Sequence, residues 1–323
     1  MRTSSSPCGT SGAFLILAAF LRVRPTVADF LECRYGQFDG IVKFAVETGN
    51  AASPWDAELI ALLPPTVKLF AAAGAGFDYM SVPDLNARGV AFANSRGAGD
   101  TATSDIGLFL ILAAFRLTSY AEWGARTGDP QVFHDVHLDI ATKARNPKGK
   151  TLACVGLGAI QREIARKAKA LGMEICYYDV ALPPPNVVEA LEARRIDSLA
   201  ELAGQADCVS VSGAYSSRSQ SKSMLALTFA LRFAVPYMES THHLIDSAFL
   251  AAMKPGSRII NTARGPVIDE VALVAALRSG HLLSAGLDVH EFEPQVSKEL
   301  IGMVRTSGKS ISVCFASLTP YAR

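Results

Sequence analysis

Two glycines separated by one residue, Gly156 and Gly158, stand between a short apolar run and an amphipathic segment. The run at 151–155 predicts a buried strand, and the apolar positions of residues 159–171 repeat with a helical period. Strand, glycine turn and helix follow in the order of the dinucleotide-binding fingerprint. The first glycine permits a tight turn, and the second lets a pyrophosphate approach the backbone at the helix N-terminus. We therefore expect a bound dinucleotide to contact the turn and the start of this helix, at Gly156, Leu157, Gly158, Ala159 and Ile160.

Asp179 follows the next expected strand, 174–178, about 20 residues beyond the glycines. A carboxylate there accepts hydrogen bonds from a ribose 2′-hydroxyl and repels a 2′-phosphate, which favours NAD and leaves NADP possible. Gln161 occupies the third glycine position of the fingerprint and is expected to push the helix slightly outward. An ordinary glycine turn and a plain carboxylate at a strand end remain the alternative interpretations.

Short β-rich runs alternate with helical runs along most of the chain, which predicts an α/β fold. With 323 residues, two domains are expected. We expect a flavodoxin-like α/β domain at 1–107, a Rossmann-type domain with a doubly wound parallel sheet at 108–294, and a return to the first domain at 295–323. A long apolar helix is expected at 101–116, capped by Thr101 or Thr103, and an irregular surface connection at 129–150.

The balance of charge excludes several classes of partner. The net charge is +1 with no basic stripe, so nucleic acid and anionic membranes are not expected partners. The apolar run 13–21 is far shorter than the ~20 residues of a membrane span. A signal-peptide core is disfavoured there, because no small-residue cleavage site follows, and a buried segment or a misassigned gene start is expected. Six scattered cysteines without metal-ligand spacing predict reduced thiols in a cytoplasmic protein that binds no metal.

Three strings in the second half of the chain are more specific: MKPG at 253–256, NTARG at 261–265, and AGLDV with a following EP at 285–294. In this order, and at this distance from the glycine turn, they resemble the D-isomer-specific 2-hydroxyacid dehydrogenases, above all the fungal glyoxylate/hydroxypyruvate reductase-like members. The resemblance implies an NAD(P)-dependent oxidoreductase that transfers a hydride to or from a small 2-oxo or 2-hydroxy acid. It also suggests a homodimer.

The resemblance assigns roles to individual residues. Arg264 would bind the carboxylate and carbonyl of the substrate, as a planar guanidinium can grip two oxygens. Glu293 would orient a catalytic histidine and raise its pKa. The substrate carboxylate would also meet backbone amides of the loop Gly74, Ala75 and Gly76. The cofactor side of the site would be lined by Thr101, Thr262, Ala263 and Asp288.

The chain departs from the family pattern in several places. Tyr321 stands where the family has its acid–base histidine, and a phenol is a poorer proton shuttle at neutral pH. Residues 216–239 replace a short loop, the first ~25 residues are expected to lack the usual first strand, and the closing helix of the family is missing. We interpret these departures as signs of a disrupted gene model, such as retained intron sequence.

Two other functions remain open. The first is a catalytically impaired nucleotide-binding homologue with a regulatory role or none. The second, an S-adenosylmethionine-dependent enzyme, is disfavoured by the spacing of Arg264 and Glu293. His290 is a weak candidate for a substitute acid, because its ring is expected to face away from Glu293. The remaining histidines are expected in loops or on the surface: His134, His137, His242, His243 and His281.

Overall fold

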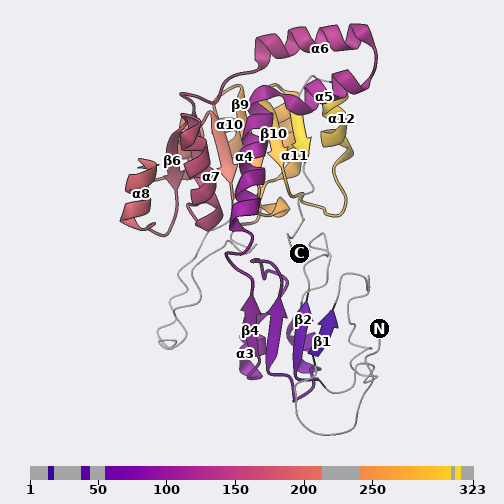
Figure 1. The fold of residues 1–323 in the computed structure, drawn as a ribbon, viewed down its shortest axis with the longest axis vertical. Helices are drawn as coiled ribbons and strands as arrows, with labels where there is room; N and C mark the ends of the chain where they lie inside the picture. Colours follow the sequence, from indigo (N-terminus) through magenta and orange to yellow (C-terminus); the bar gives the residue numbers. More distant parts are fainter. Residues whose placement is uncertain (1–13, 18–37, 44–54, 213–240, 307–309, 314–323) are drawn as a thin grey trace. The chain divides into compact units, whose positions relative to one another are not determined.

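The computed structural model describes residues 14–17, 38–43, 55–212, 241–306 and 310–313 (Figure 1). The chain divides into two compact units, 1–96 and 97–323. The expected boundary at 107 falls inside helix α4, Asp100–Arg116. Buried side chains of α4 pack into the core of the C-terminal unit, so the whole helix belongs to that unit.

The N-terminal unit contains a parallel sheet whose described strands run in the order β1-β2-β3-β4. These strands are β1 Phe14–Leu17, β2 Gly40–Lys43, β3 Leu69–Ala72 and β4 Ala91–Asn94, and the described helices are α2 Ala57–Ala61 and α3 Val82–Ala87. Trp55 and Phe70, with ring centroids 4.9 Å apart, lie in its buried core. The expected α/β unit is therefore present, although a flavodoxin-like order would place the first strand between the second and third.

Strand β1 corrects one expectation. The first 25 residues do contain a strand, and it pairs in parallel with β2, with Phe14 opposite Gly40. The apolar run that contains it is long enough for a four-residue strand at a sheet edge, and too short for a membrane span.

The C-terminal unit contains a seven-stranded parallel sheet with the order β11-β10-β9-β8-β5-β6-β7. Its strands are β5 Thr151–Val155, β6 Glu174–Tyr178, β7 Arg194–Arg195, β8 Cys208–Val211, β9 Ser257–Asn261, β10 Leu282–Leu287 and β11 Ser310–Val313. Strands β6 and β7 follow one another on one side of β5, and strands β8 to β11 follow one another on its other side. The order therefore reverses at β5, which creates the crevice where doubly wound sheets bind ligands.

Helices cover both faces of this sheet, as the Rossmann-type prediction requires. One buried core holds side chains of α4, α7 Ala159–Ala170 and α8 Pro185–Leu191. The other holds side chains of α9 Leu199–Gln205, α10 Ser247–Ala252, α11 Glu270–Arg278 and α12 Lys298–Thr306. The sheet is buried on both faces, which explains why its strands are continuous apolar runs.

The segment 129–150 is largely helical, and the expected irregular connection is wrong. Helices α5 Thr118–Arg126 and α6 Pro130–Lys143 precede β5, and α6 packs on α5 at one end of the unit (Figure 1). Asp129 caps α6 by accepting from the amides of Gln131 and Val132, and Pro130 occupies its first turn. The polar composition that suggested a loop belongs to a helix that is mostly exposed.

Two further expectations differ from the structure. The N-cap of α4 is Gly99, with no side-chain cap bond, so neither Thr101 nor Thr103 caps this helix. Strand β11 pairs with β10 inside the C-terminal sheet, so residues 298–306 and 310–313 do not return to the first unit. Among the described residues, no single helix has the length and apolar composition of a membrane span. Helices α4 and α5, which meet at 69°, satisfy both criteria only when taken together.

Candidate active site

The glycine turn lies at the carboxyl end of β5, where the strand order reverses. Gly156 has φ 80°, a left-handed conformation that favours glycine, and its amide donates to Tyr178 O at 2.7 Å. Gly158 is the N-cap of α7 in an extended conformation, so the first turn of this helix begins directly at the glycine. The backbone is therefore shaped for a phosphate group at a helix N-terminus, where the amides and the helix dipole attract negative charge.

Asp179 lies directly behind this turn, at the end of β6. Its carboxylate is buried, with Oδ2 accepting from the Leu157 amide at 2.8 Å and Oδ1 from the Ala181 amide at 2.9 Å. The residue predicted to bind a ribose thus also fixes the glycine turn. This structural role could not be predicted from the sequence, because it depends on a contact between two loops.

Gln161 is fully buried between α7 and the sheet. Its Oε1 accepts from Ser210 Oγ of β8 at 3.2 Å, while its Nε2 has no partner among the described residues. A longer side chain therefore fills the helix–strand contact that the third glycine of the fingerprint would make. Cys154 lies close by on β5, and burial raises the pKa of its thiol, so it packs as a neutral apolar group.

The loop after β9 carries Arg264, and a single side chain fixes its backbone. Asn261 Oδ1 accepts from the Ala263 amide and Asn261 Nδ2 donates to Arg264 O, both at 3.0 Å. Arg264 is half-buried, and its Nη1 donates to Ala263 O at 2.8 Å. Thr262 is buried, and its Oγ1 has no partner among the described residues. The loop holds a guanidinium and an unused hydroxyl at the carboxyl end of the sheet.

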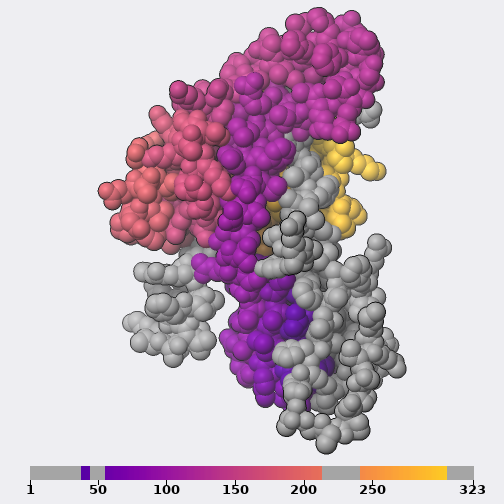
Figure 2. All heavy atoms as spheres, in the orientation of Figure 1, coloured from indigo at the N-terminus to yellow at the C-terminus, as the bar shows by residue number. Residues whose placement is uncertain are grey.

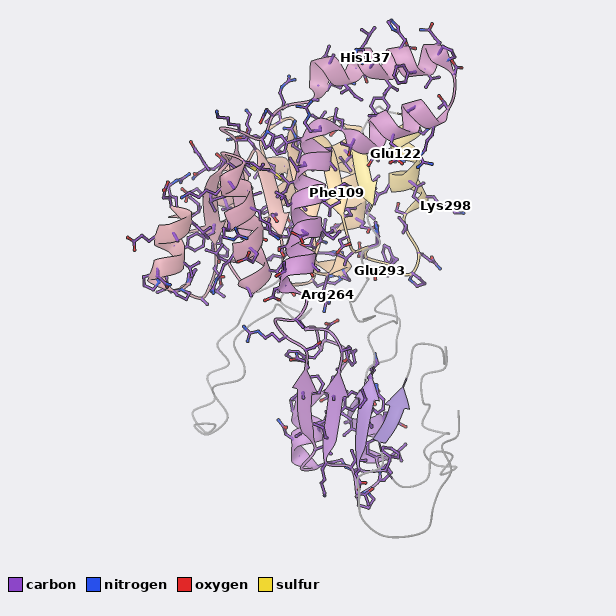
Figure 3. All side chains as sticks on the ribbon, viewed as in Figure 1. Phe109, Glu122, His137, Arg264, Glu293 and Lys298 are labelled. Carbon is purple, nitrogen blue, oxygen red and sulfur yellow. The ribbon has the colours of Figure 1, made fainter. Side chains whose placement is uncertain are left out.

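The loop after β10 carries Asp288 and Glu293, and it interlocks with the Arg264 loop. The Asp288 amide donates to Asn261 O at 2.9 Å, and Glu293 Oε1 accepts from the His290 amide at 2.7 Å. A Cβ on Gly265 would lie 1.8 Å from His290 O, so only glycine permits this contact. Figure 3 shows Arg264 and Glu293 at the same end of the C-terminal unit.

A cluster of four side chains, which we call the clasp, supports both loops: Glu270, Glu291, His290 and His243. Glu270 Oε1 accepts from the Glu291 amide at 2.9 Å, and Glu291 Oε2 accepts from the Glu270 amide at 3.0 Å. The His290 ring is buried, and its Nδ1 lies 3.3 Å from Glu270 Oε1. The ring therefore faces Glu270, which agrees with the expectation that it turns away from Glu293. His243 lies in a turn, as expected, and its half-buried ring brings Nε2 within 2.7 Å of Glu291 Oε1.

The other histidines are in simpler positions. His134 and His137 are exposed on α6, His242 is exposed in a turn, and His281 is partly exposed in the loop before β10, as expected of loop or surface residues. The motif strings gave no signal for the clasp, because its four members are spread over three segments. Glu270 begins an otherwise apolar helical segment, and its side chain is only 5% exposed. A carboxylate in such a segment is the sequence feature that could have indicated a buried, paired charge.

The loop at 73–76 belongs to the N-terminal unit. Gly74 has φ 94°, and its amide donates to Ser95 Oγ at 2.6 Å. Asn94 Nδ2 donates to Ala75 O at 2.9 Å, which fixes the loop against the end of β4. The Gly74 amide is therefore already bonded within the protein, which leaves the amides of Ala75 and Gly76 as the candidates to bind a carboxylate within the described part of this loop.

Two predicted residues have other outcomes. Thr101 is exposed in the first turn of α4, where its carbonyl accepts from Ser104 Oγ at 2.7 Å. Tyr321 lies outside the described residues, as does the segment 216–239.

A doubly wound parallel sheet, a glycine turn at its switch point, and an arginine and a carboxylate on adjacent loops define a Rossmann-type oxidoreductase that uses a nicotinamide dinucleotide. The sequence profile of the D-isomer specific 2-hydroxyacid dehydrogenase NAD binding domain matches residues 108–226 and 215–307. The chain belongs to the D-isomer specific 2-hydroxyacid dehydrogenase family, and NAD(P) is its cofactor. The two matched stretches overlap at 215–226, around the start of the segment 216–239 that is predicted to be an insertion.

Curated relatives and solved structures agree with this family. The chain is 37% identical over 281 residues to 4-methyl-2-oxopentanoate reductase A of Aspergillus oryzae, which covers 85% of this chain and 75% of the relative. It is 33% identical to glyoxylate reductase 1 of Saccharomyces cerevisiae, over 79% of this chain and 65% of the relative. The holo D-mandelate dehydrogenase of Rhodotorula graminis superposes with a TM-score of 0.77 at 58% identity, covering 90% of this chain and 76% of that one.

Proposed function

We propose that this chain transfers a hydride between NAD(P)H and a small 2-oxo acid, acting as a D-2-hydroxyacid dehydrogenase. The observation that carries the proposal is the interlocking of the loops after β9 and β10. These loops place Arg264 and Glu293 at the carboxyl end of the sheet whose β5 carries the glycine turn. Bound NAD(P)H supplies the hydride, and the remaining steps fall to the side chains.

Arg264 would bind and polarise the acid. Its guanidinium presents several N–H donors in one plane, which matches a carboxylate and an adjacent carbonyl oxygen. One of them donates to Ala263 O, and this bond holds the side chain close to its own loop. As hydride arrives at the carbonyl carbon, negative charge develops on the carbonyl oxygen, and a positioned cation stabilises it.

Glu293 would orient the proton donor. Its Oε1 is held by the His290 amide, which fixes the carboxylate without neutralising it. A fixed carboxylate can orient a proton donor by accepting a hydrogen bond from it. In the N-terminal unit, we propose that the amides of Ala75 and Gly76 form an anion-binding loop.

Asp179 would favour NADH over NADPH, because its buried carboxylate would repel a 2′-phosphate. The preferred acid is proposed from the relatives. Identity to the D-mandelate dehydrogenase is 58%, against 33% to the yeast glyoxylate reductase, which favours an acid with a bulky side chain over glyoxylate or hydroxypyruvate.

The test is a rate assay of NADH and NADPH oxidation with phenylglyoxylate, 4-methyl-2-oxopentanoate, glyoxylate, hydroxypyruvate and pyruvate. We expect reduction of phenylglyoxylate with the highest kcat/KM, and NADH preferred over NADPH. Reduction of glyoxylate alone would contradict the proposed acid, and no oxidation of either nucleotide with any acid would contradict the reductase.

A catalytically impaired homologue is the second candidate, and Tyr321 is the observation that favours it. A phenol at the position of the family histidine can donate a hydrogen bond but shuttles a proton poorly at neutral pH. We expect Tyr321→His to raise kcat by about 10²- to 10⁴-fold if the site is otherwise intact. A kcat that stays at background in both the wild type and this variant, with every acid of the panel, would favour a homologue that binds the nucleotide without turning over an acid.

We also propose a homodimer, supported by α6. Phe133 and Leu138 on this helix are 56% and 52% exposed, at an end of the C-terminal unit that Figure 2 shows projecting into solvent. Apolar side chains on a protruding helix commonly mark a protein interface. Analytical ultracentrifugation should give twice the chain mass, and Phe133→Glu should shift the protein to monomer. A wild-type monomer at micromolar concentration would contradict this proposal.

A further inference from the structure

A turn before α10 brings two histidines against the buried clasp. His242 and His243 stack with ring centroids 3.8 Å apart, and ring nitrogens of both lie within 4.8 Å of each other and of a Glu291 carboxylate oxygen. An isolated histidine on a protein surface would have no such neighbours. Two imidazoles and one carboxylate are a ligand set that divalent transition-metal ions use.

The geometry of His243 is held by several contacts. Its backbone has φ 50°, which is uncommon for a residue other than glycine, and its amide donates to Pro266 O at 2.9 Å. The ring nitrogen Nε2 is 2.7 Å from Glu291 Oε1, and Nδ1 is 4.0 Å from Asp269 Oδ2. A carboxylate near the second ring nitrogen is the arrangement that commonly orients a metal-binding histidine.

Glu291 is held equally firmly. Its side chain is 9% exposed, and its Oε2 accepts from the Glu270 amide at 3.0 Å, which leaves Oε1 toward the histidines. A carboxylate fixed through one oxygen loses little freedom when the other oxygen binds an ion. Such preorganisation lowers the entropic cost of coordination.

We propose that His242, His243 and Glu291 form a binding site for a divalent transition-metal ion, with zinc as the reference ion. Zinc takes nitrogen ligands at about 2.0–2.1 Å and carboxylate oxygens at about 2.0–2.2 Å, with a tetrahedral arrangement. The His243 and Glu291 ligand atoms must therefore separate slightly from their hydrogen-bonded distance. The exposed His242 ring supplies the second nitrogen, and water completes the coordination. Copper and nickel compete for the same set of ligands.

The site is independent of the proposed reaction, because none of its three residues is assigned a role in hydride or proton transfer. The test uses zinc ions alone with the folded chain, in competition with a chromophoric chelator and without nucleotide or acid. The wild-type protein should bind zinc at least tenfold more tightly at one site than His242→Ala does. His137→Ala, which removes an exposed histidine of α6, should bind zinc as the wild type does (Figure 3).

All these proteins contain the same cysteines, so any zinc bound by cysteines contributes equally to each measurement. The difference in zinc affinity between the wild type and His242→Ala therefore measures binding at the turn that contains His242 and His243. Equal zinc affinity in the wild type and in His242→Ala would overturn the proposal. A second variant, Glu291→Gln, keeps the side-chain size and should also lose at least tenfold in affinity. Wild-type affinity in a folded Glu291→Gln protein would overturn the proposal as well.

Discussion

Arg264 obtains its position from neighbouring residues that do no chemistry themselves. Asn261 holds the backbone of its loop on both sides, and Gly265 lets the loop contact the backbone of His290. The arginine side chain is therefore presented by a loop with little freedom. A site of this kind depends on the shape of the guanidinium as well as on its charge.

Arg264→Lys should reduce kcat/KM for a 2-oxo acid by about 10²- to 10³-fold. Lysine keeps the charge but cannot donate in a fork to two oxygens, so stabilisation of the developing oxyanion is lost. Arg166→Lys is the matched control, because Arg166 pairs with Glu163 on the exposed face of α7, away from the loops after β9 and β10. Steady-state kinetics that gave the same kcat/KM for both variants would remove Arg264 from the mechanism.

Asp179→Asn should affect both stability and cofactor choice. An asparagine has one oxygen, so one of the amides of Leu157 and Ala181 loses its acceptor, at a cost of about 1–3 kcal/mol. The preference for NADH over NADPH should fall, because the repelling charge is gone. Urea unfolding and the ratio of the two kcat/KM values measure these effects.

Asp105→Asn serves as the control for Asp179→Asn. Its carboxylate is 64% exposed and pairs with Lys167, whose ammonium also bonds Ser104 Oγ, so the free energy of unfolding should change by no more than about 1 kcal/mol. An Asp179→Asn protein as stable as wild type, with its NADH preference intact, would show that Asp179 neither fixes the turn nor reads the ribose.

At the scale of elements, α4 sets the close packing beneath the site. A Cβ on Gly286 of β10 would lie 2.9 Å from Leu110 Cβ and 3.3 Å from Leu110 O of α4. Both are rigid parts of the helix, so the glycine is required for the helix to lie against the strand. Strand β10 leads directly into the loop that carries Glu293.

Gly286→Ala should destabilise the protein by about 1–3 kcal/mol, because the added methyl group overpacks a rigid contact. The control is Gly302→Ala, where a Cβ would meet nothing within 4 Å inside α12. That change should be neutral or stabilising by up to about 1 kcal/mol, since alanine favours a helix. Denaturant midpoints that fell equally in both proteins would contradict the packing account.

Most strands and helices of the C-terminal unit follow from periodicity and glycine positions, because each is a local pattern. The motifs also placed the site loops correctly at strand ends. Helix α6 was missed because the proline and glycine positions around it indicated a loop, and because Val136 is the one residue of the helix that is buried. The clasp of Glu270, Glu291, His290 and His243 could not be predicted, because it joins residues from three segments through tertiary contacts.

At the scale of the whole molecule, the elements proposed to bind the dinucleotide lie in the C-terminal unit. The switch point at β5, the turn at Gly156 and Gly158, and the loops of Arg264 and Glu293 are parts of one sheet with its connections. The N-terminal unit adds the candidate anion-binding loop at Ala75 and Gly76. The account therefore depends first on binding of the nucleotide by the C-terminal unit.

Isothermal titration of the purified chain with NADH, in the absence of any acid, tests that dependence most directly. We predict saturable binding at one site per chain, with weaker binding of NADPH. A folded chain that binds neither nucleotide would contradict the assignment of the glycine turn, and with it the proposed reductase.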